Sequence, residues 1–117
     1  MGLPANRSVI VLPFPFSDLS NSKLRPAVVL ATAGRGDFVL CQITSNSYAD
    51  PLAIPLFSED FESGSLRHTS FARPGKLFTA NISLVAGHVG VLTTASHAKL
   101  IEAVVGLLRG GIAPTRP

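Results

Sequence analysis

The chain of 117 residues carries a net charge of +3, and its length fits one domain, residues 1–117, with one hydrophobic core. Apolar residues make up 46% of it and charged residues 15%, a globular composition with so little charge that we expect an oligomer to cover part of the surface. The single cysteine, Cys41, excludes an internal disulfide and is expected to be a buried thiol in a reducing compartment. No apolar run approaches the roughly 18 residues of a membrane span, and residues 1–8 are too short and polar for a signal peptide, so we expect a cytoplasmic protein.

An antiparallel sheet is predicted for the first half of the chain. Its first three strands are expected at residues 9–12, 26–32 and 37–44. Pro13 and Pro15 follow the first strand in an extended segment, because alternating prolines exclude a central strand paired on both sides. Residues 17–24 form a polar loop long enough to cover a site. The glycine-containing residues 33–36 join the next two strands in a hairpin, whose near-continuous apolar residues place it at the centre of the domain.

The hairpin brings an arginine and a threonine to one end of the sheet. Pro26 is expected at the first position of its strand because it lacks an N–H, and it restricts Arg25 before it to an extended backbone. In a hairpin centred near Gly34, Thr44 lies opposite Arg25. The alternative interpretations are a surface arginine that keeps the strand soluble and a polar turn after the third strand.

Shorter elements and one helix are predicted for the second half. We expect an edge strand at 52–56, an acidic surface loop at 58–64, a strand at 66–71, a turn at 73–76, an extended segment at 77–79 and a bent strand at 85–92. Thr93 or Thr94 caps a helix whose apolar residues recur at helical spacing from Leu100 to Leu108, and Gly110 and Gly111 end it. These elements predict a mainly β fold: a strongly bent antiparallel sheet of five to seven strands that forms a half-open barrel, with a C-terminal helix.

Several kinds of chemistry are excluded by motifs that the sequence lacks. It has no paired cysteines at metal-ligand spacing, no phosphate-binding glycine loop before a helix and no G-x-S-x-G motif. Of the three histidines, only His68 lies near other cations, whereas His88 is expected in a turn and His97 on the solvent side of the helix. The remaining candidates for a site are Asp18, Arg25, Thr44, Arg67, Arg73 and Lys76.

Four segments together resemble a known family. They are residues 9–18 (VIVLPFPFSD), 23–30 (KLRPAVVL), 41–45 (CQITS) and 70–79 (SFARPGKLFT). In this order and spacing they resemble the MazF/PemK family of toxin endoribonucleases, from about residue 7 to residue 108. The resemblance implies an SH3-like half-open barrel of the MazF/PemK/CcdB type that acts as a homodimer. It also implies the toxin of a type II toxin–antitoxin system that cleaves single-stranded RNA without a metal or other cofactor.

The resemblance also implies roles for individual residues. Arg25 and Thr44 fall on the catalytic positions of the family. The implied substrate-binding residues are Asp18, Ser20, Lys23, Ser45, Arg73 and Lys76. An acidic, partly disordered segment of a cognate antitoxin is expected to bind in the same groove as the RNA. No membrane is expected to be involved. One departure is Arg7-Ser8, where the family usually has Gly-Asp.

A mechanism follows from the implied roles and the chemistry of RNA. The 2′-hydroxyl is a nucleophile within the substrate, and its attack on phosphorus builds negative charge on the phosphoryl oxygens. The Arg25 guanidinium can bind those oxygens through two charge-assisted hydrogen bonds, and Thr44 can hold one of them. No general base is evident in the sequence. The alternative is a binding module of the same fold without RNase activity, such as a gyrase-inhibiting or nucleic-acid-binding toxin.

Overall fold

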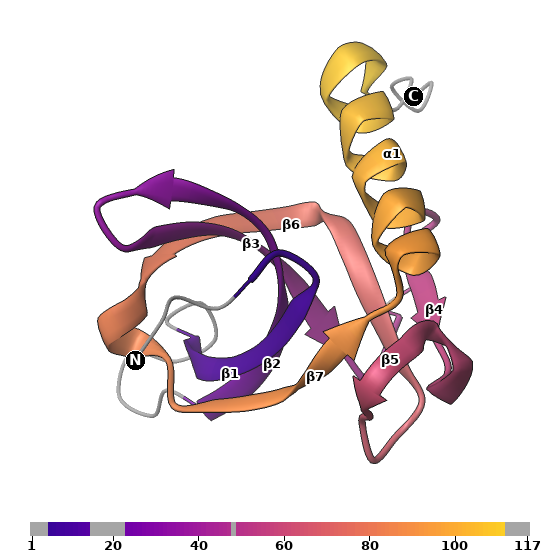
Figure 1. Ribbon diagram of the computed structural model, residues 1–117. Helices are drawn as coiled ribbons and strands as arrows, with labels where there is room; N and C mark the ends of the chain where they lie inside the picture. Colours follow the sequence, from indigo (N-terminus) through magenta and orange to yellow (C-terminus); the bar gives the residue numbers. More distant parts are fainter. Residues whose placement is uncertain (1–4, 15–22, 48, 112–117) are drawn as a thin grey trace.

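The computed structural model describes residues 5–14, 23–47 and 49–111, which form a seven-stranded sheet and one long α-helix (Figure 1). The elements are β1 (Ser8–Phe14), β2 (Lys23–Gly34), β3 (Asp37–Thr44), β4 (Ile54–Leu56), β5 (Phe61–Gly64), β6 (Ser70–Asn81), β7 (Gly87–Leu92), α1 (Thr94–Gly110) and 3₁₀ turns at Ser58–Asp60 and Ile82–Leu84. Neighbouring strands are antiparallel in the order β4-β6-β3-β2-β1-β7-β5, and the sheet curls into a half-open barrel. The predicted fold class is therefore confirmed.

The β2–β3 hairpin occupies the centre of the strand order, as predicted. β3 has the predicted bounds, whereas β2 is longer at both ends than the predicted strand. The prediction that Pro26 begins its strand is wrong, because it lies inside β2 and faces Val11 of β1. Pairing between β2 and β3 starts only at Ala27, so β1 is the single neighbour of β2 at Pro26. The missing N–H of the proline therefore interrupts no hydrogen bonds to a second strand.

Both faces of the sheet are buried, which explains the continuous apolar runs in its strands. Successive residues of a strand point to opposite faces, and here they enter two different clusters. The cluster inside the barrel contains Ile10, Leu12, Phe14, Ala27, Val29, Phe38, Leu40 and Ala80. The cluster between the sheet and α1 contains Val9, Val28, Leu30, Cys41, Ile43, Leu56, Ala72, Leu92, Leu100 and Val104. The sheet therefore serves as the shared wall of two cores.

Helix α1 begins and ends where the sequence predicts. The Thr93 hydroxyl oxygen accepts a hydrogen bond from the Ser96 N–H at 3.1 Å, and Gly111 caps the other end with a φ of 64°. The Ser96 hydroxyl donates to the Asp60 carboxylate at 2.6 Å, and the Thr93 N–H donates to the Asp60 carbonyl. Asp60 thus fastens the start of the helix to the segment before β5. None of the helices among the described residues is long and apolar enough to cross a membrane.

The turn predicted at residues 73–76 is wrong, because these residues lie inside the single long strand β6. Cys41 of β3 faces Leu77 and Ile43 faces Ala72, so the four residues between them oppose Gln42 alone. Proline and glycine produce a bulge here rather than a chain reversal. The strand predicted at 66–71 is also shorter than expected, since β6 begins at Ser70.

The predicted acidic surface loop contains an unpredicted edge strand, β5, which pairs with β7. Gly64 faces Gly90 across this pair, and a Cβ at Gly64 would collide with the Val89 carbonyl oxygen. His88 lies in β7 opposite Ile10, so its prediction as a turn residue is wrong. The short β5 has no apolar alternation, which is why periodicity did not reveal it.

His97 is half-buried rather than on the solvent side of α1, which corrects its prediction. Its Nε2 is buried and has no hydrogen-bond partner among the described residues. Burial lowers the pKa of the imidazole; a hydrogen bond with the Val29 carbonyl opposes this shift and the Arg7 charge adds to it. The helical spacing of the apolar residues did not by itself reveal that the imidazole ring of His97 packs against the barrel.

Candidate functional site

Arg25 and Thr44 lie at the end of the β2–β3 hairpin that is remote from its turn. Ala27 of β2 faces Gln42 of β3, which is the register that the predicted hairpin requires. Two residues further along each strand come Arg25 and Thr44. The prediction that the hairpin brings these two residues to one end of the sheet is therefore confirmed.

Arg25 and Thr44 line one pocket of about 310 Å³, whose wall is completed by the segment between β5 and β6. The lining residues are Leu24, Arg25, Pro26, Ile43, Thr44, Ser45, Leu66, Arg67, His68 and Ser70. Among these described residues none is acidic, and two are arginines. A pocket with this charge and these donors suits an anionic group such as a phosphate.

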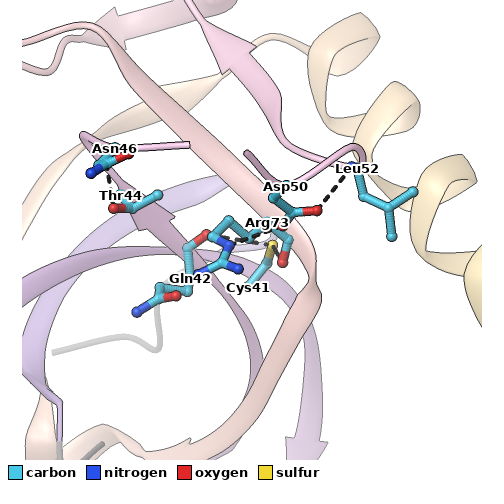
Figure 2. A network of polar contacts seen from close by, with 7 residues as sticks. All are labelled: Cys41, Gln42, Thr44, Asn46, Asp50, Leu52 and Arg73. Atoms are coloured by element: carbon cyan, nitrogen blue, oxygen red, sulfur yellow. Dashed lines mark hydrogen bonds and ion pairs between the residues drawn. The ribbon is translucent and has the colours of Figure 1, made fainter. Parts of the chain in front are cut away.

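Thr44 is almost fully buried, with 4% of its surface exposed. Its hydroxyl oxygen accepts a hydrogen bond from the Asn46 N–H at 3.2 Å, which turns the chain out of β3 (Figure 2). No acceptor for its hydroxyl proton is found among the residues that the structure describes. The hydroxyl is therefore fixed in position with a proton available for an oxygen in the pocket.

Arg25 is half-buried, and within the described ranges no carboxylate forms an ion pair with it. Pro26 restricts its backbone, and Leu12 of β1 faces it across the sheet. A rigid backbone with an unneutralised guanidinium at a pocket is the arrangement that binds a phosphate through two parallel hydrogen bonds.

Arg67 and His68, from the segment between β5 and β6, and Ser70, at the start of β6 beside Thr44, complete the pocket. Arg67 and His68 are exposed, whereas Ser70 is buried and its hydroxyl donates to the His68 carbonyl at 2.9 Å. The sequence predicted Arg67 as a candidate site residue, whereas His68 was noted only because it lies near other cations. Ser70 was not predicted, because its place in the pocket depends on the pairing of β6 with β3, in which Phe71 faces Thr44.

Arg73 braces the segment that follows Thr44 instead of lining the pocket (Figure 2). Its Nε lies 3.0 Å from Oδ2 of Asp50, and the two side chains are only 17% and 12% exposed. Oδ1 of the same carboxylate accepts from the Leu52 N–H at 2.9 Å. The Cys41 thiol donates to the Arg73 carbonyl at 3.1 Å, so this network joins β3, β6 and residues 50–52.

Electrostatics in this network follow from burial and pairing. For Asp50, burial raises the pKa, but the hydrogen bonds from Leu52 and Arg73 and the charges of Arg73 and Lys76 outweigh it and hold the pKa below its ordinary value. Burial raises the pKa of the Cys41 thiol to about 12, against the opposing effect of its hydrogen bond to Arg73. The carboxyl is thus ionised and the thiol is an inert core group at neutral pH.

Replacing Asp50 with asparagine should lower the free energy of unfolding at pH 7 by about 1.5–3 kcal/mol, the range for a hydrogen bond to a charged partner. Because the folded-state pKa of Asp50 is depressed, its contribution is present above the unfolded pKa of about 3.9 and disappears as the pH falls through the folded value. Urea denaturation at pH 7 and pH 3 measures this, with Glu102→Gln on the exposed helix face as control. A D50N penalty equally large at both pH values would contradict the assigned ion pair.

The other predicted substrate-binding residues fall into three groups. Ser45 lines the pocket, and Lys23 is exposed at the start of β2 beside the lining residue Leu24. Arg73 and Lys76 lie on the β6 bulge and do not line the pocket. Asp18 and Ser20 lie outside the described residues.

The Arg7-Ser8 departure has a structural explanation. Arg7 Nη1 lies 3.1 Å from Oε1 of Glu62 and donates to the Leu92 carbonyl at 3.0 Å, which links β5 to the end of β7. Ser8 is buried. Neither residue lines the pocket around Arg25. Among the described residues no cluster of three or more histidine, cysteine or acidic side chains could hold a metal ion.

Sequence comparisons find no relative of this chain, but comparisons of structures do. No protein-family model matches, and no curated protein matches the sequence. The structure is similar to a crystal structure of MazE-MazF from Deinococcus radiodurans, with 18% identity, a TM-score of 0.73 and coverage of 92% of this chain and 98% of that chain. It is also similar to the Mycobacterium tuberculosis toxin MazF-mt6, with 15% identity, a TM-score of 0.68 and coverage of 88% and 97%.

A third similar structure is an endoribonuclease in complex with its cognate antitoxin from a mycobacterial species. It shares 16% identity with this chain at a TM-score of 0.69, and the match covers 93% of this chain and 96% of that one. In all three comparisons the match spans almost the whole of both chains. The chain therefore has the fold of the MazF toxins.

Proposed function

We propose that the chain is the toxin of a type II toxin–antitoxin system and an endoribonuclease that cleaves single-stranded RNA. The observation that carries the proposal is the pocket in which Arg25 and Thr44 meet, with no acid among the described residues that line it. The shared fold with structures described as MazF toxins and endoribonucleases supports it. Single strands suit the site, because an unstacked backbone can bend its phosphate into a pocket of this size.

In the proposed reaction a 2′-hydroxyl of the RNA attacks the adjacent phosphorus. Arg25 binds two phosphoryl oxygens and stabilises the negative charge that develops on them in the transition state. The Thr44 hydroxyl donates a hydrogen bond to one of these oxygens and fixes the orientation of the phosphate. The P–O5′ bond breaks, and the products are a 2′,3′-cyclic phosphate and a 5′-hydroxyl end.

Exposed residues around the pocket support the remaining contacts. Lys23, Ser45 and Arg67 are exposed at its rim and are placed to bind flanking phosphates. Leu24, with 58% of its surface exposed, lies among these cations. An acidic antitoxin segment that also buries apolar side chains would match this surface, so the same groove is proposed to bind the antitoxin. We further propose a cytoplasmic homodimer.

Cleavage is expected to persist in EDTA, because the nucleophile is within the RNA and Arg25 supplies the charge that a metal would supply. Purified protein incubated with a mixed single-stranded RNA pool in EDTA should give fragments with 2′,3′-cyclic phosphate ends at a restricted set of sequences. Mapping both fragment ends by sequencing measures this. If the RNA stays intact while expression still arrests growth, the chain is a binding module that inhibits another target, such as gyrase.

A further inference from the structure

The proposed reaction leaves one step without a protein group, namely removal of the proton from the attacking 2′-hydroxyl. Neither Arg25 nor Thr44 accepts protons at neutral pH. The described residues that line the pocket include no carboxylate and no lysine. They include one imidazole, that of His68, and imidazole is the side chain that most often takes a proton in enzyme reactions near neutral pH.

His68 lies where a proton acceptor is needed. It comes from the segment between β5 and β6, and it lines the same pocket as Arg25 and Thr44. A phosphate held by those two residues would therefore share the pocket with the imidazole. The Ser70 hydroxyl, which donates to the His68 carbonyl at 2.9 Å, fixes the backbone that carries the ring.

We propose that His68 is the general base of the cleavage reaction, an inference that rests on the proposed function. The neutral imidazole takes the 2′-hydroxyl proton while the 2′-oxygen forms its bond to phosphorus. The P–O5′ bond then breaks, the leaving 5′-oxygen takes a proton from water, and the imidazolium returns its proton to water. Arg25 and Thr44 act on the phosphoryl oxygens throughout.

The charged groups that face His68 come from three elements. Arg25 lies at the start of β2 and Arg67 precedes the histidine on the same segment. Glu59, in the 3₁₀ turn before β5, shares a second pocket of about 240 Å³ with Arg67 and His68. Arg25, Arg67 and Glu59 are therefore left unchanged when the pH dependence is measured, and the test replaces the imidazole alone.

The test compares His68→Gln with His88→Gln, since His88 is also exposed but lies in β7 away from the pocket. Single-turnover cleavage is measured from pH 5 to 8. We expect wild-type and H88Q rates to rise tenfold per pH unit on the acidic side. H68Q should be slower by about 10²–10⁴ and lack this rise. An H68Q profile parallel to that of the wild type would overturn the proposal.

Two further measurements separate the general base from other roles. H68Q should bind a 2′-deoxy oligonucleotide as tightly as the wild type, because that analogue has no proton to remove; a parallel loss of binding would make His68 a binding residue only. A substrate with sulfur as the 5′-leaving atom needs no general acid, so the H68Q defect should persist on it. Rescue on that substrate would make His68 the acid. If Arg25→Ala cleaves RNA normally, the proposed function fails first, whatever H68Q does.

Discussion

Replacing Arg25 with alanine should lower the rate of RNA cleavage by about 10²–10³-fold, the loss typical of removing one preorganised donor from developing charge. The guanidinium is half-buried at the pocket and, among the described residues, has no acidic partner, so its removal leaves no unpaired carboxylate behind. The fold should therefore survive. Single-turnover cleavage of one end-labelled oligonucleotide measures the rate, and thermal unfolding checks the fold.

Two companion variants sharpen the interpretation of Arg25→Ala. Arg25→Lys keeps the charge but loses the planar fork, so it should recover only part of the lost rate. Arg109→Ala removes an exposed cation from the last turn of α1 and should cleave like the wild type. Equal losses in R25A and R109A would mean that net charge, rather than the pocket, determines the rate.

Replacing Phe14 with alanine should lower the free energy of unfolding by about 3–5 kcal/mol, the cost of emptying a large core site. Only 1% of its surface is exposed, and its ring packs edge-on against Phe78 with centroids 4.8 Å apart and planes at 67°. Whole domains have stabilities of roughly 5–15 kcal/mol, so this loss is a large fraction of the total. Urea denaturation at 25 °C measures it.

The matched control for Phe14→Ala is Phe57→Ala, because Phe57 is 52% exposed and lies outside both core clusters. Its replacement should change the free energy of unfolding by less than about 0.5 kcal/mol. If the two variants were equally destabilised, the cluster inside the barrel would not be the main core.

The sequence predicted the central hairpin well, because several signals agreed there. β-branched residues marked both strands, and glycines marked a turn in which Gly34 and Gly36 have φ values of 90° and 80°. Two register shifts lie between the turn and Ala27, and beyond them the predicted register holds, so that Arg25 and Thr44 line one pocket. Their catalytic roles stay predictions, as do those of the substrate-binding residues.

Features that depend on contacts between distant segments were predicted poorly. The proline and glycine of residues 73–76 indicate a break, but whether the chain reverses or bulges depends on its neighbour β3. Arg73 was assigned to substrate binding from the family resemblance, whereas its ion pair with Asp50 depends on how residues 49–52 fold back. The wall formed by residues 66–70 was not predicted as part of the pocket, because its place beside Arg25 and Thr44 depends on how the chain runs from β5 to β6.

The contact between Gly64 and Gly90 has a consequence for the width of the pocket. No side chain separates β5 from β7 at this point, so the two backbones approach as closely as backbone atoms permit. The chain leaves β5 at Gly64 and reaches Leu66, Arg67 and His68 directly afterwards. A methyl group at either glycine would collide with the backbone of the neighbouring strand, so β5 and the pocket wall that follows it would have to move outward. The width of the pocket therefore depends on two residues that are not among the described residues lining it.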